Sequence, residues 1–256
     1  MKDLKGKITL ITGATSGIGR AIACSFSELG SDLILIGRRK DRLKEVSEDL
    51  QNKSGIRVLS IEVDVRQYDK VKESIKSLAE EWKKIDFLIN NAGLARGLSN
   101  VSDGSVEDWE EMIDTNVKGL LYVSREVIPL MLKNNSGHII NIGSIAGREV
   151  YPKGNVYCAT KHAVDAITRS MRMELADTPV KVSTIDPGLV ETEFSLVRYR
   201  GDMEKAKKTY EGIKALTPEE VSEAVVFAAT RNDNFVVAEI VLLPKAQAST
   251  MVISRK

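Results

Sequence analysis

Short apolar runs alternate with amphipathic stretches from one end of the chain to the other. The runs are rich in β-branched residues and lie at 8–11, 33–36, 58–61, 87–89, 138–142, 180–185 and 240–243. Such continuous runs are typical of strands that are buried on both faces of a parallel sheet. Between them, 41–51 and 68–82 carry apolar residues at spacings of three and four, which predicts helices. The alternation predicts an α/β fold: a Rossmann-like, doubly wound parallel sheet of about seven strands with helices on both faces.

The alternation of predicted strands and helices continues without a linker or an internal repeat, so we expect one domain over residues 1–256. Thr217-Pro218-Glu219-Glu220 has the form of a capping box and predicts a helix from there to about Thr230. Residues 188–212 are charged, show no strand pattern and follow a strand end, which favours a substrate lid over a floppy insertion. The tail, residues 244–256, lacks helical periodicity and is expected to pack on a neighbouring copy or near the substrate site.

Composition narrows the class of protein. A formal net charge of +1 provides no general attraction for nucleic acid or an anionic membrane. No apolar run approaches the roughly 20 residues that span a bilayer, and the charged N-terminus does not resemble a signal peptide. Two cysteines are no disulfide framework, which predicts reduced thiols and a cytoplasmic location. His138 and His162 have no third ligand candidate nearby, so no metal site is predicted.

A glycine-rich turn lies between the first predicted strand and the first predicted helix. Glycines let the backbone approach a pyrophosphate closely, and the helix N-terminus offers unpaired N–H groups to the anion. A mere turn is the alternative, but the position after the first strand favours a cofactor loop. The predicted contacts are Gly13, Thr15, Ser16, Gly17, Ile18 and Gly19.

The residues after the second predicted strand decide between NAD and NADP. An NAD-specific fold needs a carboxylate there for the ribose 2′-hydroxyl, whereas this chain has Arg38 and Arg39. Paired guanidiniums can bind a 2′-phosphate. Cations at a helix N-terminus are unfavourable because they oppose the helix dipole, so their presence here needs another reason. We therefore predict NADP. Asp64-Val65 fits an adenine contact, although a turn-forming aspartate explains the local pattern almost as well.

Ser144, Tyr157 and Lys161 form the predicted catalytic set. Tyr157 and Lys161 are four residues apart, so they share one helix face. A nearby ammonium favours the phenolate, and we expect it to lower the pKa of Tyr157, which serves as general base and acid. Ser144 is expected to bind the substrate oxygen, while Lys161 also contacts the cofactor ribose. Each motif alone is common, but chance is a poor explanation for their occurring together with the phosphate loop.

Taken in chain order, these motifs resemble those of the short-chain dehydrogenase/reductase family. The matches are Thr12-Gly13-x-x-x-Gly17-Ile18-Gly19, Asn90-Asn91-Ala92-Gly93, Asn116, Ser144 and Tyr157-x-x-x-Lys161. They span most of the chain. The resemblance implies that Asn116 anchors a water in a proton relay through Lys161, and that the enzyme is a homotetramer. It further implies cofactor contacts from Asn91, Ala92, Gly93, Pro187, Gly188, Val190 and Thr192, with Thr192 on the carboxamide.

Longer segments resemble one group within that family, the NADP-dependent 3-hydroxy acid dehydrogenases. They are 105–110, 143–148, 187–195 and 197–202. This resemblance implies oxidation of the hydroxyl of serine, L-allo-threonine or 3-hydroxyisobutyrate. Because such substrates carry a carboxylate, we expect at least one of Arg148, Arg198 and Arg200 to bind it. Two alternatives stay open: a reductase of a sugar, steroid or 3-ketoacyl thioester, and a non-catalytic NADP-sensing regulator.

Overall fold

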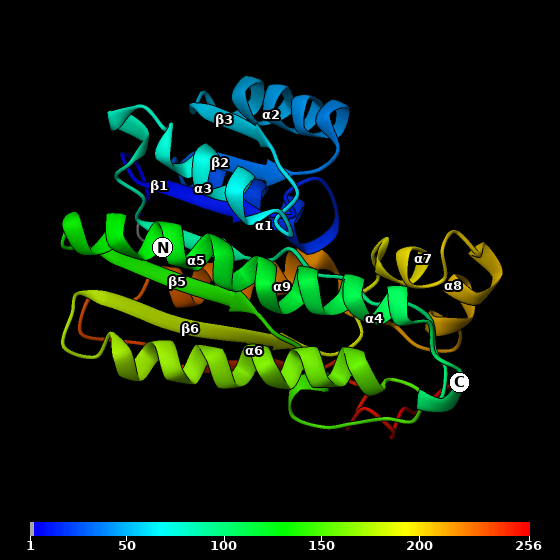
Figure 1. The fold of residues 1–256 in the computed structure, drawn as a ribbon. Coiled ribbons are helices and arrows are strands. Elements are labelled where there is room, and N and C mark those ends of the chain that lie inside the picture. Colours follow the sequence, from blue (N-terminus) through cyan, green and yellow to red (C-terminus); the bar gives the residue numbers. More distant parts are fainter. Residues whose placement is uncertain (1–2) are drawn as a thin grey trace.

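The computed structural model describes residues 3–256 and has the predicted seven-stranded parallel sheet (Figure 1). The strand order is β3-β2-β1-β4-β5-β6-β7, so the order reverses between β1 and β4. The strands are β1 (Ile8–Thr12), β2 (Asp32–Gly37), β3 (Val58–Glu62), β4 (Phe87–Asn90), β5 (Gly137–Ile142), β6 (Val180–Pro187) and β7 (Glu239–Leu242). Every residue of β1, β4 and β5 is buried, as the unbroken apolar runs predicted. In open α/β sheets, ligands bind beyond the strand carboxyl ends at such a reversal.

Helices cover both faces of the sheet (Figure 1). Outside residues 188–212, the α-helices of the described chain are α1 (Gly17–Glu28), α2 (Lys40–Ser54), α3 (Tyr68–Lys76), α4 (Val106–Ile113), α5 (Leu120–Lys133), α6 (Asn155–Glu174) and α9 (Pro218–Ala229). Side chains of α1, α2 and α9 form one apolar core against the sheet, and those of α3, α5 and α6 form the other. The capping box is confirmed: Thr217 Oγ1 accepts from the Glu220 N–H, and Glu220 accepts in return from the Thr217 N–H. The doubly wound architecture is therefore confirmed.

The helix predicted over 68–82 ends earlier than its periodicity suggested. α3 stops at Lys76, and a single 3₁₀ turn, η1 (Glu80–Trp82), follows after a break. Leu78 and Trp82 still pack against the same core as Val71, because the turn keeps them on that side of the chain. Apolar spacing therefore overestimated the length of this helix.

The 188–212 segment contains two short helices, α7 (Phe194–Arg198) and α8 (Met203–Tyr210). Both lie beyond the carboxyl ends of the strands (Figure 1). A parallel bridge between Val190 and Leu216 holds the start of the segment beside the residues that follow it. This places α7 over the strand ends, where a ligand is expected.

His138 is a core residue of β5. It is 1% exposed, and its Nε2 lies 2.7 Å from Ser183 Oγ. Burial lowers its pKa to about 3, because the charged imidazolium would lose its hydration. The ring is neutral near pH 7.

No helix within residues 3–256 is long and apolar enough to cross a membrane.

Candidate active site

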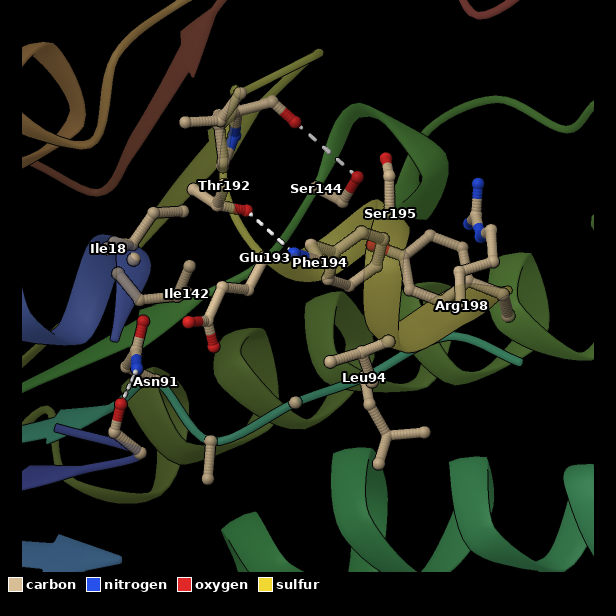
Figure 2. A pocket seen from close by; sticks show the side chains of 18 of the residues that line it. Ile18, Asn91, Leu94, Ile142, Ser144, Thr192, Glu193, Phe194, Ser195 and Arg198 are labelled. Atoms are coloured by element: carbon tan, nitrogen blue, oxygen red, sulfur yellow. Dashed lines mark hydrogen bonds between the residues drawn. The ribbon is translucent and has the colours of Figure 1, made fainter. Parts of the chain in front are cut away.

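A cavity of about 600 Å³ lies at the carboxyl ends of the strands, at the reversal between β1 and β4. The phosphate loop, the ends of β2, β4, β5 and β6, helix α7 and the C-terminal tail all contribute to its wall. Figure 2 shows Ile18 and Asn91 on one side of the cavity and Leu94 and Arg198 on the other. The cavity therefore extends from the predicted phosphate loop to the predicted catalytic residues.

The phosphate loop has the backbone geometry that its glycines permit. Gly13 and Gly17 adopt positive φ angles of 66° and 52°, which favour glycine. A Cβ on Gly19 would collide with the Gly13 carbonyl and the Asn91 amide. Ser16 precedes α1 without capping it through its side chain, so the first N–H groups of the helix have no side-chain partner. These features make a cradle for an anion at the N-terminus of α1.

Arg39 lies beside this cradle. Its Nη2 donates to Thr15 Oγ1 and to Ser16 Oγ, both at 2.8 Å. Arg38 and Arg39 both line the cavity, where Arg38 Nη1 lies 3.7 Å from the nearest Asp64 oxygen. The strand end is therefore cationic, as the NADP prediction requires.

Asp64 also lines the cavity, but its carboxylate is engaged by Arg66. The Arg66 guanidinium contacts both oxygens, with Nη2 to Oδ2 at 2.6 Å, and it holds the pKa of Asp64 below its ordinary value against the effect of burial. Val65, next to it, lines the same wall. An adenine contact by Asp64 remains a prediction, and it would have to share the carboxylate with Arg66.

Ser144, Tyr157 and Lys161 converge on the other half of the cavity. Ser144 follows β5, and its hydroxyl accepts from Ala146 N at 3.1 Å, which fixes the turn η4 (Ile145–Gly147). Tyr157 and Lys161 lie on α6. The Tyr157 ring packs with Leu94 and Phe194 in a small apolar cluster, with Phe194 edge-on at 5.7 Å between ring centroids. The structure thus brings Ser144, Tyr157 and Lys161 into one cavity, whereas Asn116 is not among the residues that line it.

Burial dominates the electrostatics of Tyr157. Loss of hydration raises its pKa to about 12, while the Arg198 guanidinium and hydrogen bonding by Ser144 act in the opposite direction. This differs from the expectation that a nearby ammonium lowers the pKa. The reason lies in Lys161, which is itself buried and donates from Nζ to the Ile142 carbonyl at 2.9 Å. Burial lowers the pKa of Lys161 to about 8, with Asp186 opposing that shift.

Asn116 lies in a π-helical turn, η3 (Asp114–Gly119), between α4 and α5. Its side chain accepts from Leu94 N and donates to Leu94 O, both at 2.8 Å, and donates to Thr160 Oγ1 at 3.0 Å. Both amide hydrogens are therefore used to hold the Leu94 backbone and α6 together. A water relay through Asn116 remains a prediction. The water would have to donate its hydrogen bond to the second lone pair of Asn116 Oδ1 or to another acceptor.

Arg148 is not where a substrate-binding arginine should be. It does not line the cavity, because its Nη2 is bound to Asp186 at 2.6 Å and to Glu239 at 2.7 Å. A Cβ on Gly143 would overlap Asp186 Oδ1, so the residue before Ser144 must be small for this ion pair to form. Arg148 therefore fixes the Ser144 turn onto β6 and β7. The prediction that Arg148 binds a substrate carboxylate is therefore wrong, because its guanidinium is already paired outside the cavity.

Arg200 is likewise committed elsewhere, since it forms an ion pair with Asp108. Arg198 is different. It lines the cavity from α7, with its guanidinium carbon 5.1 Å from the Tyr157 ring centroid. Its Nη2 donates to the Tyr151 hydroxyl at 2.9 Å, while its buried Nε makes no hydrogen bond within residues 3–256. Among the three arginines considered, only Arg198 has both access to the cavity and an unused buried donor.

Several lining residues were not singled out from the sequence. Tyr151 contacts Arg198, and Gln247 of the tail accepts from Leu189 N at 2.9 Å beside Gly188. Thr250 and Ile253 complete the wall, so the tail reaches the cavity, one of the two places predicted for it. Of the other predicted cofactor contacts, Ala92, Gly93, Pro187, Gly188, Val190 and Thr192 also line it, whereas Gly19 does not, because it packs against Gly13 and Asn91 behind the loop. Tyr151 and Gln247 have no local motif that could have revealed them.

The model of the short chain dehydrogenase family matches residues 7–201. The chain belongs to this family. Among other family members, it is 43% identical over 257 residues to an NADP-dependent 3-hydroxy acid dehydrogenase of Schizosaccharomyces pombe, which covers 100% of this chain and 99% of that protein. It is 47% identical over 242 residues to a protein of the same name from Escherichia coli strain K12, covering 94% and 96%.

Two solved structures of family members match the fold. A closed form of serine dehydrogenase complexed with NADP⁺ superimposes with a TM-score of 0.91 at 45% identity, covering 97% of this chain and 99% of that one. Serine dehydrogenase from Escherichia coli matches with a TM-score of 0.81 at 41% identity, covering 94% and 99%. The fold is thus that of a short chain dehydrogenase.

Proposed function

We propose that this chain is an NADP-dependent oxidoreductase that oxidises the hydroxyl of small 3-hydroxy acids such as serine, L-allo-threonine or 3-hydroxyisobutyrate, and reduces the matching carbonyl compounds. The residues present fit the cofactor. The uncapped start of α1 and the crowded Gly19 form a pyrophosphate cradle, and Arg38 and Arg39 supply the cations at the 2′-phosphate end. In addition, the buried Thr115 hydroxyl lines the cavity without a hydrogen-bond partner among the described residues.

Bound NADP⁺ supplies the hydride acceptor and a positively charged ring. The chain's own residues transfer the proton. Tyr157 takes the proton of the substrate hydroxyl, and Ser144 positions the substrate oxygen by a hydrogen bond. Because burial disfavours the phenolate, the nearby positive charge of Arg198 and the hydrogen bond from Ser144 assist by stabilising the deprotonated form. The apolar cluster of Leu94 and Phe194 around Tyr157 excludes water from the reacting atoms.

One observation supports a carboxylate on the substrate: the guanidinium of Arg198 in the wall next to Tyr157. Its Nε is buried and has no hydrogen-bond partner in the described part of the chain, and a buried charged donor without a partner is costly. A substrate whose hydroxyl lies at Tyr157 would bring its carboxylate close to this guanidinium, whose carbon lies 5.1 Å from the Tyr157 ring centroid. The similarity to enzymes named 3-hydroxy acid and serine dehydrogenases supports the same substrate class.

The test compares substrates with and without a carboxylate. Replacing Arg198 by methionine is expected to lower kcat/KM for serine and 3-hydroxyisobutyrate by about 100-fold, since a charge-assisted hydrogen bond contributes up to about 3 kcal/mol. For a neutral polyol the loss should stay within about five-fold. Arg200→Met, which removes an arginine two positions away that pairs with Asp108, is the matched control. Equal losses on both substrate types would exclude a carboxylate contact and favour a reductase of another carbonyl.

The proposal includes a cytoplasmic homotetramer. Support for assembly comes from exposed apolar side chains on three helices: Ile113 on α4, Leu121 and Leu132 on α5, and Met173 on α6. Covering such side chains on two-fold axes would remove apolar area from water. Light scattering coupled to size-exclusion chromatography should give four times the 28.2 kDa chain mass. A monomer peak at micromolar concentration would refute this part.

A further inference from the structure

Glu193 connects the two ends of the cofactor site. It precedes α7 and extends from the catalytic side towards the phosphate loop, while Arg198 lies at the other end of the same helix (Figure 2). Its carboxylate accepts from Arg42 Nη1 at 2.7 and 2.9 Å and from Arg39 Nη1 at 3.1 Å. Arg42 lies in the first turn of α2, just after the pair predicted to bind the 2′-phosphate. An ion-pair bridge therefore runs from the 188–212 segment to the 2′-phosphate end of the cavity.

The bridge uses the donors that a 2′-phosphate would need. The Nε and Nη2 of Arg39 donate to Thr15 Oγ1, Nη2 donates also to Ser16 Oγ, and Nη1 donates to Glu193. Both bidentate edges of this guanidinium are thus occupied. The hydroxyls of Thr15 and Ser16 are neutral and can themselves hydrogen-bond a phosphate. Glu193 cannot, because two anions on the same arginine repel each other.

The arginines also hold Glu193 ionised. Hydrogen bonds from Arg42 and Arg39 keep the pKa of its carboxyl below the ordinary value, against the effect of partial burial. The carboxylate therefore stays charged at neutral pH and remains a competitor there. Since the Glu193 side chain is 40% exposed, the bridge is a modest interaction, of the strength that a bound phosphate dianion can displace.

Taking the NADP dependence of the proposed function as given, we propose that Glu193 is an internal anion that competes with the 2′-phosphate of NADP, and that Arg42 is a third arginine of the 2′-phosphate site. Binding of the phosphate transfers Arg39 and Arg42 from Glu193 to the cofactor. Glu193 is then released, and with it the start of α7. Phe194 and Arg198 of α7 contact Tyr157, so occupancy of the 2′-phosphate site is coupled to the helix over the catalytic residue.

Adenosine 2′,5′-bisphosphate and adenosine 5′-monophosphate test the competition without turnover. By titration calorimetry at fixed ionic strength, Glu193→Gln should bind the bisphosphate about three- to five-fold more tightly than the unsubstituted protein, the range expected for an exposed ion pair. Its affinity for the monophosphate should not change. Arg42→Gln should bind the bisphosphate about five-fold more weakly. Glu191→Gln removes the same charge two residues away and is the matched control, with both affinities unchanged.

Hydrogen exchange tests the coupling to α7. In the unsubstituted protein, saturating bisphosphate should speed amide exchange over residues 193–198, whereas the monophosphate should not, and Glu193→Gln should abolish the difference. Unchanged or weaker bisphosphate binding by Glu193→Gln would overturn the proposal, as would tightening equal to that of Glu191→Gln. If the unsubstituted protein does not prefer the bisphosphate, the NADP dependence itself fails, and this inference with it.

Discussion

Replacing Tyr157 by phenylalanine is expected to lower kcat by about 10³- to 10⁴-fold, the upper range of a lost general acid–base group. The substitution removes one hydroxyl and keeps the ring that packs with Leu94 and Phe194, so the cavity keeps its shape. Affinity for NADP should stay within about two-fold, because the phosphate loop and the arginines are untouched. Steady-state oxidation of serine and fluorescence titration with NADPH measure the two quantities.

Tyr122→Phe is the matched control for that substitution. Tyr122 lies on α5 away from the cavity, with its ring 5.1 Å from that of Tyr68. Removing its hydroxyl should leave kcat unchanged. If Tyr157→Phe kept more than a tenth of the original kcat, another group would have to take the hydroxyl proton.

The second large effect is on cofactor choice. Exchanging both Arg38 and Arg39 for glutamine should lower kcat/KM for NADP by about 100-fold, because each charge-assisted contact to the phosphate contributes about 1.5 kcal/mol. With NAD, which lacks the 2′-phosphate, kcat/KM should change by less than about three-fold. The ratio of the two efficiencies, measured with one substrate, isolates the phosphate contribution.

Lys44→Gln controls for the loss of positive charge on this side of the molecule. Lys44 is an exposed residue of α2 whose ammonium lies 3.8 Å from Glu48. It should leave the NADP to NAD ratio as it was. If the double variant lost kcat/KM equally with NADP and with NAD, the arginines would stabilise the fold of the strand end and would not bind the 2′-phosphate.

The sheet and the catalytic cluster could be predicted because their signals are local in sequence. Unbroken β-branched runs marked the strands, and a parallel sheet places its carboxyl ends at one edge. Residues that follow those ends, such as Gly13, Arg38 and Ser144, therefore had to meet. Tyr157 and Lys161 joined them because one helix face carries both.

The role of Arg148 could not be predicted, because its partners are distant in sequence. Asp186 and Glu239 lie 38 and 91 residues further along the chain, and only the pairing of β5, β6 and β7 brings them to it. The same holds for the Glu193 bridge, which spans more than 150 residues. Long-range charge pairing leaves no periodic trace, so a count of arginines near Ser144 could not distinguish a substrate ligand from a structural clamp.

The bridge between Val190 and Leu216 has a consequence for how this protein can change. Leu216 N donates to Leu189 O at 3.0 Å and Glu191 N donates to Leu216 O at 2.9 Å, so the two ends of the intervening stretch are fastened side by side. Lengthening or exchanging what lies between costs little loop-closure entropy and leaves the sheet intact. The stretch behaves as a replaceable cassette. Grafting it from a relative with other preferences should retarget the enzyme while Ser144, Tyr157 and Lys161 stay in place.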